Sequence, residues 1–217
     1  MRKLKLQEYC LGVSQRRNSM ETRDILNKLE QGEITVEEAE GYFRKQPIEE
    51  LGYAKLDMHR KLRSGFAEVI FCSGKADEHL LNIFGKLYEA DGEVFGTRAS
   101  SEQYELIRNI YPETDYDPIS HIIKIEKPNK PRVGRIAVCT AGTADIPVAE
   151  EAAQTAEYFG TAVDRIYDVG VSGIHRLLAR VDTIQGANCV VAVAGMEGAL
   201  ASVIGGLVDK PVIAVPT

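Results

Sequence analysis

The chain has 217 residues, of which 44% are hydrophobic and 27% are charged, and its formal net charge is −6. This composition is typical of a globular protein of one or two domains, and it excludes a collagen-like, low-complexity or disordered chain. The acidic balance predicts no nucleic-acid partner, because nucleic-acid binding usually requires a basic surface. Cys10, Cys72, Cys139 and Cys189 form no CxxC pair, so we expect no zinc knuckle and a cytoplasmic location.

One segment has the length and composition of a membrane span. Residues 189–208 are almost wholly apolar, and a span needs about 20 such residues. Glu197 lies near the middle of the segment, where a carboxylate is costly in lipid, and its neighbours favour a turn. We therefore expect a strand followed by a buried helix, with no membrane partner. No apolar stretch follows the basic N-terminus, so a signal peptide is not expected either.

The first 65 residues are expected to form an N-terminal helical segment. Thr35 and Glu38 have the spacing of a capping box, in which each side chain bonds the backbone of the other. Gly32 and Gly65 are typical residues at which a helix ends. Helices are therefore predicted at residues 22–31, 35–45 and 57–63.

A small α/β module is expected at residues 66–127. Its apolar runs and amphipathic stretches have the spacing of βα units, with strands at 68–72, 93–97 and 121–125 and helices at 77–90 and 101–111. Residues 126–131 follow it and contain two prolines among polar residues, which is typical of a linker. We place a domain boundary there, because charged residues become less frequent beyond it.

Residues 132–217 predict a third domain, with a parallel sheet. Their four strands, at 135–139, 162–168, 188–193 and 211–215, are near-continuous runs of Val, Ile and Ala, and helices at 145–159, 173–181 and 197–208 separate them. Strands of this kind are covered on both faces, so the expected fold is a three-layer Rossmann-like or flavodoxin-like α/β domain. The chain ends two residues after the last expected strand, so we expect this domain to be truncated at its C-terminus.

Ligands of such a fold bind beyond the carboxyl ends of the strands, which directs attention to three loops. The first loop contains Thr140, Gly142, Thr143 and Asp145 just before a helix, where hydroxyls and backbone N–H groups suit a phosphate or carboxylate. It is neither a Walker loop nor a GxGxxG motif. Asp145 is read equally well as the N-cap of the following helix, with no further role.

The second loop contains Gly173, His175 and Arg176. The imidazole can donate a proton and the guanidinium can hold an anion, although a solvated helix start is an alternative interpretation.

The third loop contains Glu197, the only charged residue between Asp182 and Asp209. An apolar setting raises the pKa of a carboxyl, as a general acid or base requires. Stabilisation by the dipole of the following helix is the alternative. The loop also contains Gly195, Met196 and Gly198.

Two further expectations concern packing. The helix at 199–208 is apolar on all sides and contains Gly205 and Gly206, so we expect close packing of a neighbouring backbone in a homo-oligomer. Cys189 is expected to lie in the core, and Cys139 in the core or at the rim of the binding site.

These motifs together resemble a known family. Gly142-Thr143-Ala144-Asp145 and Gly173-Ile174-His175-Arg176, with residues 194–199 and 211–216, resemble the PurE-like (AIR carboxylase) fold in the variant of the LarB family, which acts in nickel-pincer nucleotide biosynthesis. In the amino half, residues 56–60, 65–69, Gly74-Lys75 and Thr97-Arg98 are similar to LarB as well. The resemblance covers about residues 50–217.

The resemblance implies an activity. LarB-like proteins carboxylate the pyridinium ring of nicotinic acid adenine dinucleotide with CO₂ and cleave its phosphoanhydride, giving pyridinium-3,5-biscarboxylate mononucleotide and AMP. Mg²⁺ assists, its ligands in this chain being unknown, and no tightly bound organic cofactor is expected. The implied catalytic residues are Glu197, Asp145 and His175. The implied substrate-binding residues are Thr140, Gly142, Thr143, Gly173, Arg176, Gly195, Met196, Gly198 and Lys75.

Two alternatives remain open. The first is a PurE-like carboxylase or mutase of purine biosynthesis, against which the long N-terminal extension and Glu197 speak. The second is a catalytically inactive nucleotide-binding or regulatory protein. In the LarB family a cysteine after the last strand adds to the pyridinium ring, and none of the four cysteines of this chain matches its motif.

Overall fold

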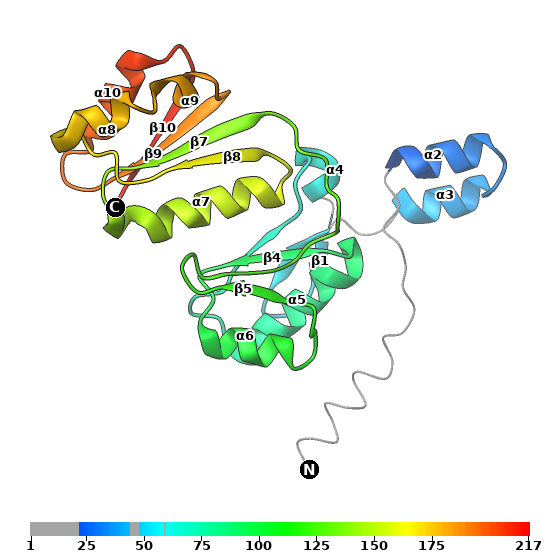
Figure 1. Cartoon of the computed structure of the whole chain (residues 1–217). Coiled ribbons are helices and arrows are strands. Elements are labelled where there is room, and N and C mark those ends of the chain that lie inside the picture. Colours follow the sequence, from blue (N-terminus) through cyan, green and yellow to red (C-terminus); the bar gives the residue numbers. More distant parts are fainter. Residues whose placement is uncertain (1–21, 44–47, 59) are drawn as a thin grey trace. The chain divides into compact units, whose positions relative to one another are not determined.

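The computed structural model describes residues 22–43, 48–58 and 60–217. They divide into two compact units. One comprises the described residues up to Glu68 together with Asn82–Glu93, and the other comprises Val69–Leu81 together with Val94–Thr217. The first unit therefore includes residues 66–68 and 82–93 of the small α/β module predicted at 66–127. Figure 1 shows the elements of both units.

The first unit begins with a helical pair, α2 (Thr22–Glu30) and α3 (Val36–Phe43). The predicted capping box is present, because Thr35 N donates to Glu38 Oε2 at 2.8 Å and Glu38 N donates to Thr35 Oγ1 at 3.1 Å. Gly32 follows α2 with φ of 72°, a backbone conformation that favours glycine. The predicted end of the second helix at Lys45 lies outside the described residues.

The helix predicted at 57–63 is wrong in its first turn. α4 (Arg60–Ser64) starts later, and Asp57 belongs to a hairpin of β1 (Ile48–Glu50) with β2 (Lys55–Asp57). Leu56 is 3% exposed between two more exposed neighbours, which is the alternation of a strand. Three-residue strands are too short for such alternation to be read from sequence.

A mixed sheet of order β3-β4-β6-β5 opens the second unit. β3 (Val69–Phe71) and β4 (Val94–Thr97) are parallel, whereas β6 (Ile122–Ile125) is antiparallel to both β4 and β5 (Asp115–Asp117). α5 (Asp77–Asp91) connects β3 to β4 along the chain, and α6 (Ser101–Arg108) follows β4. β5 was not predicted, because an edge strand reading Asp-Tyr-Asp carries no apolar signal.

The predicted parallel sheet is confirmed, with order β10-β9-β7-β8. The strands are β7 (Arg135–Thr140), β8 (Ala162–Ile166), β9 (Cys189–Ala194) and β10 (Val212–Pro216), all parallel. The intervening helices are α7 (Ile146–Tyr158), α8 (Ile174–Leu178), α9 (Val181–Gln185) and α10 (Ala199–Leu207). The helix predicted at 173–181 is therefore two short helices.

Both faces of this sheet are covered, as a three-layer fold requires. Val138, Val191 and Val193 pack against Ala149 and Ala153 of α7 on one face. The alternate strand residues face the other side, where they pack against α8, α9 and α10, and the residues of that cluster include Ala137, Cys139, Val190, Ala192, Leu177, Ile184, Leu200 and Ile204. Figure 1 shows α7 apart from the other three helices. The strand order is flavodoxin-like, and the order reverses between β7 and β9, where such folds bind ligands.

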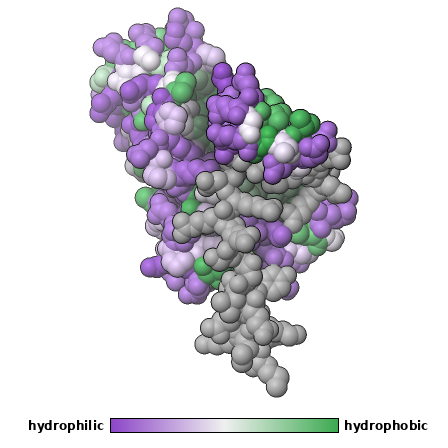
Figure 2. Space-filling view, turned by 90° about the vertical axis from the view of Figure 1, so that its right-hand side faces the viewer, coloured by the Kyte–Doolittle hydropathy of each residue, from purple (hydrophilic) through white to green (hydrophobic). Residues whose placement is uncertain are grey.

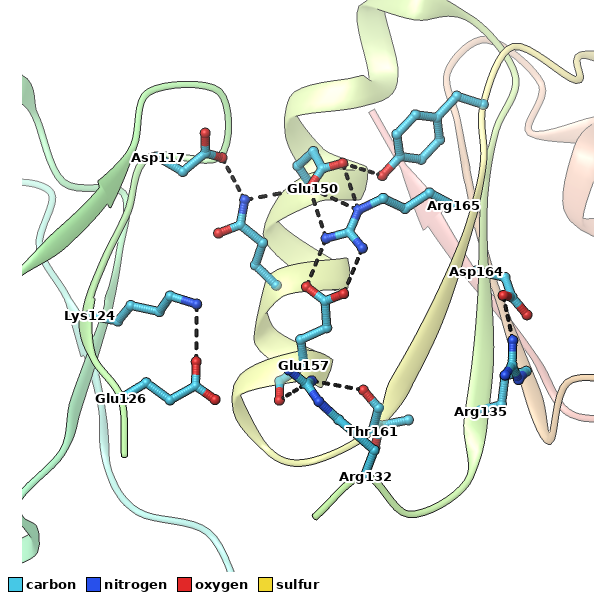
Figure 3. Close-up of polar contacts among 12 residues, drawn as sticks. Asp117, Lys124, Glu126, Arg132, Arg135, Glu150, Glu157, Thr161, Asp164 and Arg165 are labelled. Atoms are coloured by element: carbon cyan, nitrogen blue, oxygen red, sulfur yellow. Dashed lines mark hydrogen bonds and ion pairs between the residues drawn. The ribbon is translucent and has the colours of Figure 1, made fainter. Parts of the chain in front are cut away.

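The linker is fixed to the C-terminal end of α7. Lys130 Nζ donates to Tyr158 O at 2.8 Å and lies 3.8 Å from the centroid of the Tyr158 ring. Arg132 Nη1 donates to the carbonyl oxygens of Glu157 and Thr161 (Figure 3). Lys130 and Arg132 therefore attach the proline-containing linker to α7, although most residues at 127–134 are exposed.

The apolar helix α10 is only partly enclosed by the described residues of its own chain. Only Leu200 and Ile204 of α10 are buried, and Gly205 and Gly206 are exposed with open space where a side chain would extend. α10 has nine residues, and no helix in the described part of the chain is long and apolar enough to cross a membrane. Elsewhere the visible surface is mostly hydrophilic, with hydrophobic residues in small groups (Figure 2).

An ion-pair network joins α7 to β8. Arg165 donates through Nε and Nη2 to Glu150 and through Nη1 and Nη2 to Glu157, and Tyr167 donates its hydroxyl to Glu150 Oε1 at 2.6 Å (Figure 3). The hydrogen bonds from Arg165 hold the pKa of Glu157 below its usual range, and burial followed by Glu150 raises the pKa of Tyr167. One guanidinium thus compensates two carboxylates of the same helix.

Replacing Arg165 by Met is expected to reduce the free energy of unfolding by about 1–3 kcal/mol, because two partly buried carboxylates lose their shared partner. Arg165→Lys, which keeps the charge without the forked geometry, should lie between this variant and the wild type. A carboxyl with a lowered folded pKa stabilises the fold above its unfolded pKa, and this contribution disappears as pH falls through the folded pKa. The difference between wild type and Arg165→Met should therefore shrink in urea titrations below about pH 4. A difference that grows with acidity would contradict this role.

Candidate functional site

Hydrogen bonds at Thr140 and Ala141 connect the carboxyl ends of β7, β8 and β9. This residue ends β7 and is fully buried. Its Oγ1 accepts a hydrogen bond from Asp168 N at 2.9 Å, and its carbonyl oxygen accepts one from Val169 N at 2.9 Å, both beyond β8. Ala141 N donates to Val193 O of β9 at 3.0 Å. The predicted site residue Thr140 therefore fixes the loop after β8 at the point where the strand order reverses.

Asp145 fixes the loop after β7. It ends a 3₁₀ turn, Thr143–Asp145, and is 8% exposed. Its Oδ2 accepts from Gly142 N at 2.9 Å, and its Oδ1 accepts from Thr217 Oγ1 at 2.7 Å, beyond β10. Asp145 stands at the N-cap position of α7, yet within the described structure its side chain makes no capping bond to that helix. The carboxylate joins two loops instead, so the interpretation of Asp145 as a simple cap is wrong.

Glycines allow these loops to approach one another closely. A Cβ added at Gly170 would lie 2.6 Å from Ala141 O, so the loops after β7 and β8 pack backbone against backbone. A Cβ at Gly195 would lie 3.2 Å from Thr217 Oγ1 and 3.3 Å from Thr217 O. Side chains at either position would push apart the loops that surround the site.

The loop after β8 carries the two predicted polar residues. Arg176 of α8 forms an ion pair with Asp168, and its guanidinium lies against Gly173, where an added Cβ would be 2.7 Å from Nε. His175 is exposed on the same short helix. Arg176 is thus held in place at the edge of the sheet, whereas His175 is presented to solvent.

Glu197 is exposed, which corrects the expectation of an apolar environment. It lies in the turn between β9 and α10, not in the helix, beside Met196 with φ of 53° and Gly198 with φ of 66°. Gly198 N donates to Gly195 O at 3.0 Å and closes the turn, and Met196 is fully exposed. The sequence neighbours are apolar because β9 and α10 are packed, but the turn between them points outward.

The structure connects some of the predicted residues. Asp145 accepts from Gly142, and Arg176 lies against Gly173. Thr140 is linked to Arg176 through Asp168, and Asp145 is linked through Thr217 to Gly195. Thr143, His175, Met196 and Glu197 extend from the same loops with exposed side chains. Lys75 follows β3 in the other sheet, where its N–H donates to Cys72 O at 3.1 Å.

Two residues of this network were missed as site residues in the sequence, Asp168 after β8 and Thr217 after β10. Their position directly beyond a parallel strand was a usable signal, because all such positions meet at one edge of the sheet. Gly170 lies in the loop after β8 to which the rule for parallel sheets directs attention, although it was not predicted to bind substrate.

Cys72 and Cys139 are unsuited to covalent catalysis. Both are fully buried, and burial raises the pKa of each thiol to about 12, which Lys75 offsets in part for Cys72. The nucleophilic form of cysteine is the thiolate, so neither side chain is activated near neutral pH. Cys139 lies in the core, which was one of the two positions expected for it. Cys189 of β9, which was expected in the core, is only partly buried.

Iodoacetamide at pH 8 should therefore leave Cys72 and Cys139 unmodified in the folded protein, and should alkylate both once urea unfolds it. Mass spectrometry of tryptic peptides measures each site separately. Cys72 or Cys139 reacting in native protein as fast as in urea would show that one of them is accessible and ionised.

The described residues do not form a protein cage for a metal ion. No group of three or more His, Cys, Asp and Glu side chains lies together among them. Mg²⁺ is often held by one or two carboxylates with substrate phosphates, so the lack of such a group does not bear on a Mg²⁺ that arrives with the substrate, and no step proposed below passes through one.

The domain pattern identifies the class of protein. Residues 135–217 match the AIR carboxylase family model, and residues 48–127 match the model for the LarB/PurE-like N-terminal domain. The protein is thus a carboxylase-type enzyme with a PurE-like domain. An uncharacterized protein of Methanocaldococcus jannaschii is 36% identical over 205 residues, which cover 90% of this chain and 80% of that protein. The chain belongs to the LarB family.

Proposed function

We propose that the protein carboxylates the pyridinium ring of nicotinic acid adenine dinucleotide with CO₂ and hydrolyses its phosphoanhydride to release AMP. One observation carries the proposal: the loops after β7, β8 and β10 are joined through Thr140 and Asp145 at the reversal of strand order. This edge is where a flavodoxin-like sheet binds a nucleotide. The LarB-type N-terminal match favours the dinucleotide over a purine precursor.

Nucleotide binding is assigned to the loop after β7 and to Arg176. α7 has 13 residues and begins at the loop that Asp145 stabilises, and the N-terminus of a helix suits a phosphate. Arg176 supplies a planar set of donors for a second anionic group, the ring carboxylate or the other phosphate. Asp145 acts chiefly by holding Gly142 and Thr217 in position, so that the loop is ordered before substrate binds.

The proton chemistry is assigned to the exposed residues. Carboxylation replaces the C5–H bond of the ring by a C–C bond to CO₂, and the released proton passes to Glu197 or His175. Hydrolysis of the phosphoanhydride consumes one water molecule, which Glu197 orients. Because the pyridinium ring is electron-poor, a nucleophile must first add to it, and the buried thiols of Cys72 and Cys139 do not supply that nucleophile.

A substrate comparison tests the proposal. The protein is incubated with CO₂ and either nicotinic acid adenine dinucleotide or aminoimidazole ribonucleotide, and loss of each substrate is followed by chromatography. We expect turnover of the dinucleotide only. Turnover of the aminoimidazole ribonucleotide would establish a purine carboxylase or mutase instead. Calorimetric binding of the dinucleotide without turnover would indicate a nucleotide-binding or regulatory protein.

A homo-oligomer formed through α10 and β10 is proposed as well. β10 pairs only with β9 within the described chain, Ile213 of β10 is 53% exposed, and Gly205 and Gly206 of α10 face open space. Burying such apolar surface is favourable, and exposed glycines allow close approach of a second backbone. Sedimentation velocity at micromolar concentration should show a species larger than a monomer. A single monomer peak would refute the proposal.

A further inference from the structure

Asp168 is held in an uncommon backbone conformation. It lies two residues beyond β8 with φ of 57°, a value that few residues other than glycine adopt. Its backbone N–H donates to Thr140 Oγ1, a fully buried partner. Strained residues of this kind persist where the surrounding structure fixes them, and they gather at functional sites.

The neighbours of Asp168 fix it from both faces of the sheet. Tyr167, before it, packs with the α7 face and donates its hydroxyl to Glu150. Val169, after it, is 4% exposed in the core of the opposite face, and its N–H donates to Thr140 O. The carboxylate of Asp168 is therefore directed by the backbone, although the side chain itself is half exposed.

That carboxylate contacts Arg176. The ion pair joins Asp168 Oδ2 to Arg176 Nη1, while Gly173 leaves room for the guanidinium to fold back over its Cα. The next residue, Leu177, is fully buried and anchors α8 to the core. Arg176 is thus fixed at its backbone by Leu177 and at its tip by Asp168.

We propose that Asp168 is a positioning residue that orders the Arg176 guanidinium for an anionic group of the nucleotide. The inference rests on the proposed function in that it takes Arg176 as an anion-binding residue. Arginine carries five N–H donors, so a pair through Nη1 leaves donors on the same plane for a phosphate. The positive φ of Asp168 is then explained by this role, because it belongs to the conformation in which the carboxylate contacts Arg176.

Two opposing effects decide the sign of the expected result. Asp168 competes with a bound anion for Arg176, but the competition is weak, because the pair is half exposed and screened by water. Ordering a long arginine side chain on binding costs conformational entropy, and the Asp168 pair together with the packing on Gly173 meets part of that cost before the anion arrives. Asp168 therefore strengthens anion binding by ordering Arg176 in advance, and its removal weakens binding.

The test uses Asp168→Asn with AMP as the probe. Asparagine adopts positive φ readily, so this change removes the charge and preserves the backbone. We expect the Kd for AMP to rise about 3-fold, as the loss of a half-exposed ion pair allows, and the Arg176 Nη1–H signal in NMR spectra of the ligand-free protein to lose its protection from exchange. Asp209→Asn is the matched control, because Asp209 is a surface carboxylate paired with Lys210, and it should change neither quantity.

Two comparisons separate positioning from direct contact. If Asp168 acts through Arg176, Asp168→Asn combined with Arg176→Lys binds AMP no more weakly than Arg176→Lys alone. The loss in Asp168→Asn should also be equal for AMP and 2′-deoxy-AMP. The inference would be overturned by additive losses, by a loss confined to AMP, by tighter binding, or by an unchanged Nη1–H signal. A wild-type protein that binds AMP as expected but carboxylates nothing would remove the proposed activity and leave this inference standing.

Discussion

Replacing Asp145 by Ala is expected to reduce kcat/KM for nicotinic acid adenine dinucleotide by about 100-fold or more. Both oxygens of this buried carboxylate hold loops that form the site, and displacing a binding loop by about 1 Å can cost a factor of about 10² in rate. The free energy of unfolding should fall as well, by about 1–3 kcal/mol, because Gly142 N and Thr217 Oγ1 lose their acceptor. Steady-state kinetics and urea unfolding measure the two effects.

Glu197→Gln provides the contrast to this result. Glu197 is exposed in its turn, so the change should leave the unfolding free energy within about 0.5 kcal/mol of wild type, yet turnover should be abolished if the carboxylate handles a proton. The two variants together separate a residue that orders the site from one that takes part in chemistry. Wild-type rates in both would refute the assignment of the site.

Replacing Gly170 by Ala is the second change with a large expected effect. The new Cβ would lie 2.6 Å from the carbonyl oxygen of Ala141, so one of two loops of the site must move. Overpacking of this kind typically costs about 1–3 kcal/mol, and backbone cannot yield as a flexible side chain can. We expect that loss in urea unfolding and at least a 10-fold rise in the Kd for AMP by calorimetry.

Gly186→Ala is the matched control for this experiment. Gly186 follows α9 in the same unit with φ of −73°, and an added Cβ would meet its neighbours at 3.4 Å, an ordinary contact. Alanine fits that conformation, so stability should be unchanged or slightly raised, and AMP binding unchanged. If Gly170→Ala matched Gly186→Ala in stability and in its Kd for AMP, the close approach of the two loops would not be needed for binding.

The parallel sheet could be predicted because its strands are near-continuous apolar runs of five or six residues, separated by helical segments. Runs such as Arg135–Thr140 and Cys189–Ala194 are apolar on both sides, and only a sheet covered by two helical layers buries both sides. The hairpin of β1 with β2 and the edge strand β5 carry no such signal. Their strands have three residues each, and pairing across the chain decides their conformation.

The sequence predicted which loops form the candidate site, but not how exposed their side chains are or which residues they contact. The loops after β7 and β9 follow from the rule for parallel sheets, and Thr140 and Asp145 indeed occupy that edge. The exposure of Glu197 could not be predicted, because apolar neighbours in sequence say nothing about the direction of a turn. The partners of Asp145 were equally hidden, since Thr217 lies 72 residues away along the chain.

The most direct test of the proposed activity is isotope labelling of the product. The protein is incubated with nicotinic acid adenine dinucleotide, Mg²⁺ and ¹³C-bicarbonate, and the mixture is analysed by mass spectrometry. The proposed reaction predicts AMP together with pyridinium-3,5-biscarboxylate mononucleotide that carries one ¹³C in its new carboxylate, and formation of both products slowed about 100-fold or more with Asp145→Ala. Intact dinucleotide, or AMP release without incorporation of label, would contradict it.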